Sequence, residues 1–90
     1  MSHKDNSRHQ NIRRVAIDLL SRREHSSFEL ARKLAIRSFD ALEIDEVLVK
    51  LRDEGLQSDV RFTEAYVYFR IQKGYGPIRI QADLKQRGID

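Results

Sequence analysis

Apolar residues recur along this chain at the three- and four-residue spacings that are typical of amphipathic α-helices. No segment of useful length alternates apolar and polar residues, which is the pattern that would indicate a strand. The pattern therefore predicts an all-α fold. The expected apolar stripes are Ile12, Val15, Ala16, Leu19 and Leu20; Leu30, Ala31 and Leu34; Ile44, Val47, Leu48 and Leu51; and Phe62, Ala65, Tyr66 and Phe69.

Capping residues mark where three of these helices begin. Ser26 is followed three residues later by Glu29, which is the capping-box pattern, and Asp40 gives a second N-cap signal. Ser58 or Asp59 can cap the fourth helix.

Glycine and proline mark most of the remaining boundaries. Pro77 suits the first turn of a fifth helix, where a missing N–H has no cost. Gly55, Gly74 and Gly88 are expected to end the third, fourth and fifth helices.

The helices repeat at an offset of 50 residues. Ile12 corresponds to Phe62, and Leu34 corresponds to Leu84. This spacing predicts tandem three-helix repeats, of which the second is incomplete. We expect a flexible polar tail over residues 1–11, a first repeat over 12–57, and the first two helices of a second repeat over 58–90. The apolar side of the second repeat should be partly bare.

Composition excludes several classes of protein. The chain has 90 residues and no cysteine, which excludes a disulfide scaffold, a thiol nucleophile and a cysteine-based zinc site. No apolar run approaches the roughly 18–20 residues that span a bilayer, and the first residues lack an apolar signal core. We expect a cytoplasmic protein that does not insert into a membrane.

Candidate catalytic chemistry is sparse. His3, His9 and His25 do not have the spacing of metal ligands, so no metal site or cofactor is expected. The carboxylates of residues 40–54 are expected to be solvated rather than paired in a cleft, and no nucleophile–base pair is evident. The sequence therefore does not indicate an enzyme.

Charge is segregated along the chain although the net charge is only +3. Residues 40–59 hold seven acidic and two basic side chains, whereas residues 69–90 hold five basic and two acidic ones. Such patches steer association with oppositely charged partners, although solvated helix faces would also account for them.

The segment Gly74-Tyr75-Gly76-Pro77 superficially resembles a phosphate-binding loop. It lacks the preceding strand and the Gly-Lys-Ser/Thr ending, so a turn between helices is favoured. Basic side chains and a tyrosine surround it, and they suit nucleic acid, an acidic protein groove or solvent equally well. These basic-edge residues are Arg70, Lys73, Tyr75, Arg79, Lys85 and Arg87.

A winged-helix DNA reader is a competing interpretation of residues 28–56. Its recognition helix would be the segment from about 43 to 54, which carries five acidic and two basic residues. That charge has the wrong sign for a DNA groove, and a helix cap at Ser58 replaces the expected wing.

Several segments together resemble the bacterial RecX family over residues 12–90. The most specific is Arg70-Ile71-Gln72-Lys73-Gly74-Tyr75-Gly76-Pro77-Ile78-Arg79-Ile80. The others are residues 16–26, Glu29-Leu30, Lys33-Leu34, Val47-Leu48, Leu51 to Leu56, 59–66, Leu84 and 87–89.

The resemblance implies tandem three-helix repeats, a non-enzymatic role in the bacterial cytoplasm, and the RecA recombinase as partner. Family members bind the RecA–DNA filament, in its helical groove, and restrain its ATPase, strand-exchange and coprotease activities; DNA binding is also known. Family chains usually continue through a third helix of this repeat and a further repeat, whereas this sequence stops at Asp90.

Combining the resemblance with the charges gives a hypothesis for the contacts. The acidic residues Asp45, Glu46, Asp53 and Glu54 would face basic RecA loops, and the basic-edge residues would face acidic protein or the bound strand. We expect the protein to act as a monomer. The alternative is a stand-alone module that binds single- or double-stranded DNA.

Overall fold

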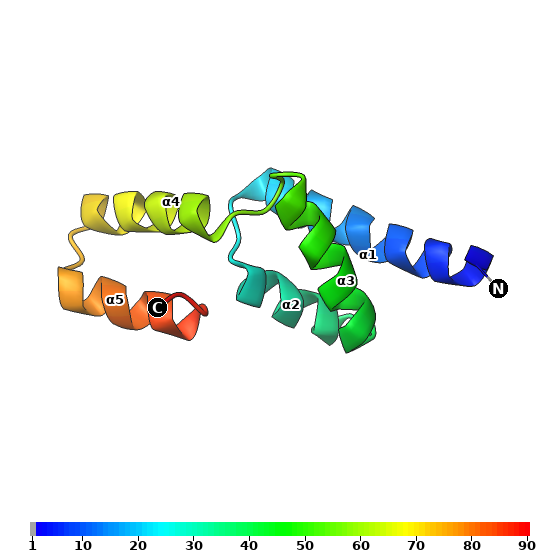
Figure 1. Ribbon diagram of the computed structural model, residues 1–90. Coiled ribbons are helices and arrows are strands. Elements are labelled where there is room, and N and C mark those ends of the chain that lie inside the picture. The colour runs from blue at the N-terminus through cyan, green and yellow to red at the C-terminus, as the bar shows by residue number, and fades with distance from the viewer. Residues whose placement is uncertain (1) are drawn as a thin grey trace.

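The computed structural model describes residues 2–90, with side chains described from residue 7 onward, and this part of the chain contains helices and no strand. The all-α prediction is therefore confirmed. The molecule is elongated, 52 × 20 × 18 Å, with three helices in one half and a two-helix hairpin in the other (Figure 1). The helices are α1 (Ser2–Arg22), α2 (Ser27–Ile36), α3 (Ala41–Asp53), α4 (Asp59–Gln72) and α5 (Pro77–Gln86).

The predicted helix starts at Ser26, Asp40 and Ser58 are confirmed. Ser26 Oγ accepts a hydrogen bond from the Glu29 N–H at 3.0 Å, and a Glu29 carboxylate oxygen accepts one from the Ser26 N–H at 3.1 Å. The Asp40 carboxylate accepts bonds from two N–H groups of α3. Of the two candidates for α4, Ser58 is the cap, and Asp59 is the first helical residue.

The predicted helix ends are confirmed at Gly55, Gly74 and Gly88, which have φ values of +77°, +86° and +80°. Glycine adopts this left-handed conformation without the clash that a Cβ would cause. Pro77 is the first residue of α5, as expected from its fixed φ. The segment between Gly74 and Pro77 is therefore a turn between two helices, not a phosphate loop.

Helix α1 is longer than predicted. It begins at Ser2, whereas the apolar stripe placed the start at Ile12 and a tail before it. Residues 2–11 contain no proline or glycine, and two pairs join α1 to α3: His9 Nε2 lies 2.9 Å from Glu46 Oε1, and Arg13 Nη2 lies 2.7 Å from Glu54 Oε1. The apolar stripe begins at Ile12, so it could not indicate that the helix extends through the polar residues before it. Flexibility over 1–11 stays a prediction, and Met1 lies outside the described residues.

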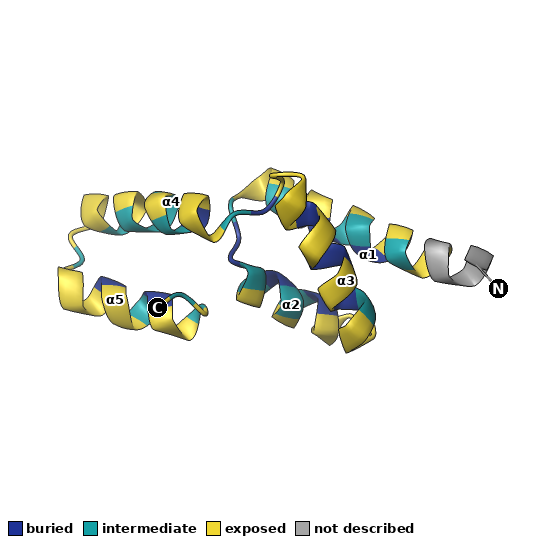
Figure 2. Ribbon diagram, in the orientation of Figure 1, coloured by how far each residue is buried: buried dark blue, intermediate teal, exposed yellow. Residues whose placement is uncertain are grey.

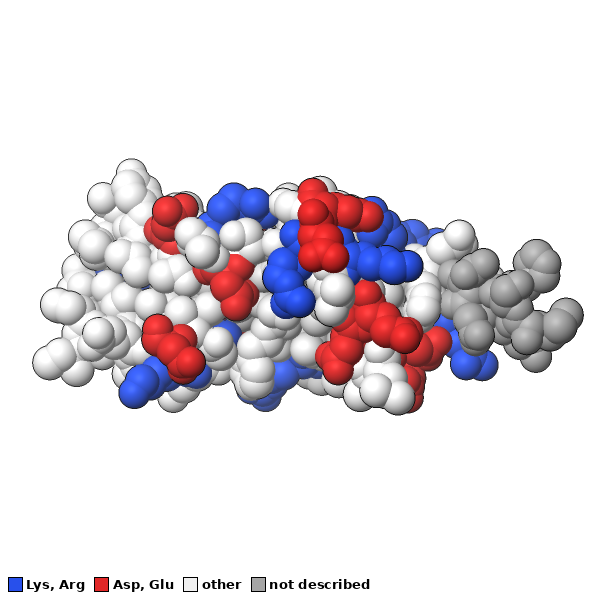
Figure 3. Space-filling model, viewed as in Figure 1, with Lys and Arg blue, Asp and Glu red and all other residues white. Residues whose placement is uncertain are grey.

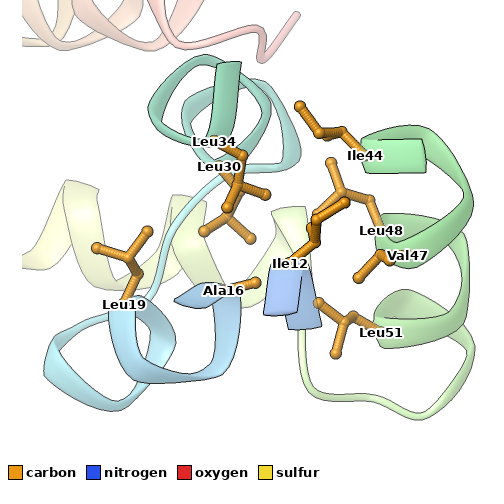
Figure 4. Packing of buried hydrophobic residues seen from close by; sticks show 9 residues of the cluster. All are labelled: Ile12, Ala16, Leu19, Leu30, Leu34, Ile44, Val47, Leu48 and Leu51. Carbon is orange, nitrogen blue, oxygen red and sulfur yellow. The ribbon is translucent and has the colours of Figure 1, made fainter. Parts of the chain in front are cut away.

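Helices α1–α3 enclose the main hydrophobic core. Their buried apolar side chains point toward one another from all three helices (Figure 4). Full burial of an aliphatic side chain of this size contributes about 1.5–3 kcal/mol. The predicted stripes of the first unit are thus confirmed as core, and Val15, Leu20, Ala31 and Phe39 pack against it while partly buried. The fully enclosed members are Ile12, Ala16, Leu19, Leu30, Leu34, Ile44, Val47, Leu48 and Leu51.

The α4–α5 hairpin has a much smaller core. It consists of Phe62, Ile80 and Leu84, with Tyr66, Val67, Tyr75 and Ile89 packed around it. Phe69, which the sequence placed in the same stripe as Phe62, is instead 62% exposed. Its side chain lies edge-on against Tyr68, and the two ring centroids are 5.8 Å apart. Apolar spacing alone did not reveal that no other element covers this position.

A buried polar joint connects the hairpin to the three-helix unit. Ser26 Oγ donates a hydrogen bond to the carbonyl of Arg87 at 2.8 Å, and the Ser27 N–H donates to Asp59 Oδ1 at 2.9 Å. Gln57, which is buried, donates through Nε2 to the His25 carbonyl and to Asp59 Oδ1. In Figure 2 the connection between α1 and α2, which contributes His25 and Ser26 to this joint, is coloured as buried.

Every described buried side-chain polar atom of the molecule has a partner, so the joint carries no unpaired group. None of the described helices is both long and apolar enough to cross a bilayer.

Candidate interaction surface

Arginine and tyrosine side chains form a partly buried, stacked ladder that runs across α4 and α5. The order is Arg87, Tyr66, Arg70, Tyr75, Arg79. The Cζ atoms of Arg87 and Arg70 lie 4.7 and 4.8 Å from the Tyr66 ring centroid. Those of Arg70 and Arg79 lie 5.0 and 3.7 Å from the Tyr75 ring centroid. Arg70 therefore contacts both rings, and the ladder is continuous.

Helical spacing explains how the ladder forms. Tyr66 and Arg70 are one turn apart on α4, whereas Arg79 and Asp83 on α5 and Arg87 at its C-cap follow one another at four-residue intervals. The Tyr66 hydroxyl donates to Asp83 Oδ2 at 3.1 Å, which fixes the ring against α5. A guanidinium that stacks on a ring keeps its N–H edge available, and that edge matches carboxylates and phosphates.

A shallow hollow of about 330 Å³ lies beside the ladder. It gathers four basic side chains and one acidic side chain, and this excess of positive charge favours an anionic ligand. The lining residues are Arg23, Glu29, Tyr66, Phe69, Arg70, Lys73 and Arg87.

Glu29 is the acidic residue of this hollow. Its oxygens accept bonds of 3.0 and 3.1 Å from Arg23, and Arg87 Nε lies 3.5 Å away. Burial opposes ionisation of the carboxyl, but the hydrogen bonds from Arg23 and from the Ser26 N–H prevail and lower the pKa of Glu29. The ionised carboxylate thus holds two arginines in place at the edge of the joint.

The structure brings most of the predicted basic-edge residues together. Arg70, Tyr75, Arg79 and Arg87 belong to the ladder, and Lys73 lies in the adjoining hollow. Lys85 is apart from them. It lines a different hollow with Ile78, Gln81 and Leu84, on another side of α5.

The predicted acidic residues lie on the exposed side of α3. Asp45, Glu46, Asp53 and Glu54 are all exposed, but α1 contributes His9 beside Glu46 and Arg13 beside Glu54. Figure 3 shows acidic side chains gathered in the half that contains α3, with basic ones among them, whereas the hairpin end on this face is mostly uncharged. The acidic side of α3 is therefore exposed, and the Arg13 guanidinium offsets part of its charge at Glu54.

Several residues of the surface were missed by the sequence interpretation. Tyr66 was assigned to the core, Glu29 to a helix cap, and Arg23 and Asp83 to no role. The four-residue spacings of Tyr66 with Arg70, and of Asp83 with both Arg79 and Arg87, are the signals that could have indicated the ladder.

The winged-helix interpretation fails on its second half. After Gly55 the chain enters α4 rather than a pair of strands. In the described part of the chain, no three His, Asp or Glu residues gather as metal ligands.

The fold and the surface define an all-α protein that is built from repeated helical units and presents segregated charge. Residues 13–51 match the family described as RecX, first three-helix domain, and residues 58–90 match RecX, second three-helix domain. The chain belongs to the RecX family, and the tandem order that the internal repeat predicted is confirmed.

The chain is also similar to curated RecX proteins. It is 47% identical over 78 residues to the regulatory protein RecX of Pseudomonas fluorescens, covering 87% of this chain and 50% of that one. It is 49% identical to the regulatory proteins RecX of Pseudomonas savastanoi pv. phaseolicola and of Ectopseudomonas mendocina. Each match covers 87% of this chain, and it covers 50% of the former protein and 52% of the latter. The chain thus spans about half the length of these relatives, which are named as regulatory proteins rather than as enzymes.

Proposed function

We propose that this protein binds the RecA–DNA filament in the bacterial cytoplasm and inhibits or modulates the ATPase, strand-exchange and coprotease activities of RecA. The observation that carries the proposal is the match of both helical units, in order, to the first and second RecX domains. The protein would act as a monomer without catalytic residues, a cofactor or a metal.

The proposed mechanism is occlusion or stabilisation of one state of the filament. The acidic side of α3, with Asp45, Glu46, Asp53 and Glu54, would face basic loops of one RecA protomer. The ladder would face acidic protein or the bound strand. An elongated molecule of 52 Å with opposite charges on different parts can bridge neighbouring protomers.

The ladder supports the proposal because it is ordered before binding. Arg70 lies between two rings, and Arg87 is held by Tyr66 and Glu29, so these side chains lose little conformational freedom when they meet an anion. Ordering a free arginine on binding would cost about 0.5–1.5 kcal/mol for each side chain.

Charge reversal at Arg70, Lys73 and Arg79 together tests the proposal. This triple variant should lose at least about tenfold in affinity for RecA filaments that are assembled on DNA with a slowly hydrolysed ATP analogue. Inhibition of RecA ATPase should fall in parallel. Lys85→Glu is the matched control, because it changes a lysine of the same hairpin on another side of α5. Unchanged ATPase inhibition by the triple variant would sink the assignment of the ladder.

The ladder also favours a second candidate function, a stand-alone nucleic-acid-binding module. Guanidinium groups neutralise phosphates, and the exposed ring of Phe69 in the adjoining hollow is a group on which a base can stack. In that case, anisotropy of a labelled oligonucleotide should rise without RecA, and the affinity should fall steeply between two salt concentrations. Binding that requires the assembled filament would instead favour the RecA regulator.

A further inference from the structure

A second hollow, of about 350 Å³, lies between α2 and the end of α5. It shares Glu29 and Arg87 with the hollow beside the ladder, so the two adjoin at the joint. Its other lining residues are Phe28, Arg32, Lys33, Ile36 and Gln86. We call this second hollow the α2 groove.

One side of the α2 groove combines apolar and basic side chains. Phe28, Arg32 and Ile36 follow one another at four-residue intervals and therefore lie along one side of α2. Ile36 is 78% exposed and Phe28 is 45% exposed. The Arg32 guanidinium lies 5.8 Å from the Phe28 ring centroid.

The charge of the α2 groove is positive. Arg32, Lys33 and Arg87 surround a single carboxylate, that of Glu29. Two of these cations already have polar partners, because Lys33 Nζ donates to His25 Nε2 at 2.9 Å and Arg87 contacts Glu29. Arg32 is the exposed cation among the three, beside the exposed apolar residues.

We propose that the α2 groove binds a segment of a partner protein in which acidic residues alternate with apolar ones. The carboxylates of such a segment would pair with Arg32 and its neighbours, and the apolar side chains would cover Phe28 and Ile36. The positive charge of the groove favours the acidic residues of the segment, and the exposed side chains of Phe28 and Ile36 favour its apolar residues.

A protein segment fits the groove better than a nucleic acid does. A single strand carries a phosphate at every nucleotide, so it must place negative charge near Glu29. A peptide can instead place an apolar side chain there. Phe28 offers a ring for one base, but Ile36 is aliphatic and offers no second ring for the next base along a strand.

The inference does not rest on the proposed function. Arg32 and Ile36 belong neither to the ladder nor to the acidic side of α3, and both can be changed while the ladder stays intact. Failure of one proposal therefore leaves the other standing.

The test measures the anisotropy of a short labelled peptide in which Glu alternates with Leu. The comparison probes are the same peptide with Ser in place of Leu, and labelled oligothymidine. The Glu–Leu peptide should bind the whole chain at least about fivefold more tightly than the Glu–Ser peptide, because only the former covers Phe28 and Ile36.

Two variants locate the site. Arg32→Glu should weaken binding of the Glu–Leu peptide about tenfold, and Ile36→Ser should weaken it about threefold. Arg52→Glu is the matched control, because it makes the same change of charge on the exposed side of α3 and should leave the affinity unchanged. Circular dichroism of each variant verifies that the helices are retained.

Three outcomes would overturn the proposal. The first is equal affinity of wild type and Arg32→Glu for the peptide. The second is that wild type binds oligothymidine more tightly than the peptide and that Arg32→Glu no longer binds oligothymidine. The third is self-association in sedimentation that Arg32→Glu abolishes, which would make a second copy of this chain the occupant.

Discussion

The two helical units use equivalent positions in different ways. Leu19 of the first unit is 5% exposed, whereas Phe69, its counterpart 50 residues later, is 62% exposed. In the first unit, α3 packs across α1 and α2 and closes the core. In the second, α4 and α5 enclose only three buried apolar side chains.

The difference shows that the two units depend on different forces. The first is stabilised mainly by apolar burial, which is strong and non-directional. The hairpin has little of this and instead depends on hydrogen bonds of the joint and on stacked rings, which are weaker but directional. We therefore expect the hairpin to open at lower free energy than α1–α3.

The largest expected loss of stability comes from shortening a core leucine, and it should differ between the equivalent leucines of the two units. Leu34→Ala removes a fully enclosed side chain and should cost about 3 kcal/mol of unfolding free energy, whereas Leu84→Ala should cost about 1–2 kcal/mol. Urea denaturation followed by circular dichroism measures both. Equal losses would contradict the contrast between the units.

Two glycines with similar backbone conformations give the next contrast. A Cβ at Gly88 would lie 2.5 Å from Phe28 Cβ, whereas a Cβ at Gly55 would meet nothing within 4 Å. Both substitutions to alanine bear a left-handed penalty of about 1–2 kcal/mol. Gly88→Ala should cost at least about 1 kcal/mol more, because it also forces α2 and the end of α5 apart. An equal drop in melting temperature for both variants would argue against the contact between position 88 and Phe28.

Sequence reasoning succeeded where local chemistry determines the structure. Ser26 and Glu29 formed the predicted cap, Gly55 and Gly88 ended their helices, and Leu30 and Leu34 are core, because each depends on neighbours within one or two turns. The start of α1 was placed too late, because the residues before Ile12 are polar and no apolar stripe marks them as helical.

The site was predicted only in part, for a related reason. Charge and the segment that resembles the family singled out Arg70, Arg79 and Arg87, but whether they meet depends on how α4 and α5 pack. The same packing puts Lys85 on another side of α5. Tyr66 was not identified because an apolar stripe and a stacking ladder use the same spacing.

The joint should make stability sensitive to acid. His25 Nδ1 donates to the Arg23 carbonyl at 3.0 Å, and Nε2 accepts from Lys33, so the buried ring is neutral. Burial, and then the charges of Arg23 and Lys33, lower the pKa of His25 below its ordinary value of 6.5. The unfolded chain therefore binds a proton more readily than the folded chain.

It follows that unfolding free energy should fall as pH drops through 6.5 toward the lower folded pKa of His25, by at most about 1.4 kcal/mol per pH unit. Above this window, His25 adds no pH dependence. Urea titrations at several pH values measure the slope. His25→Gln should flatten it. An unchanged slope in His25→Gln would contradict this prediction.

The smallest effect is expected from surface ion pairs. Arg61 joins Glu24 across the two units at 3.0 Å, whereas Arg22 joins Asp18 within α1 at 3.0 Å. The Arg22–Asp18 pair is largely exposed and the Arg61–Glu24 pair is partly exposed, so Arg61→Ala and Arg22→Ala should each cost less than about 1 kcal/mol, and less still at high salt. A large loss for Arg61→Ala alone would mean that the units are joined by charge rather than by the buried hydrogen bonds.

The two hydrogen bonds of Ser26 limit which residues can replace it. Its one hydroxyl accepts the N-terminal bond of α2 and donates to the last turn of α5. Aspartate, usually as good a cap as serine, would fill the first role but has no proton for the second. A substitution that looks conservative for one helix would thus place a carboxylate oxygen against a carbonyl of the other. The choice of residue at this position is therefore constrained by two helices, through a bond whose donor and acceptor are 61 residues apart in the chain.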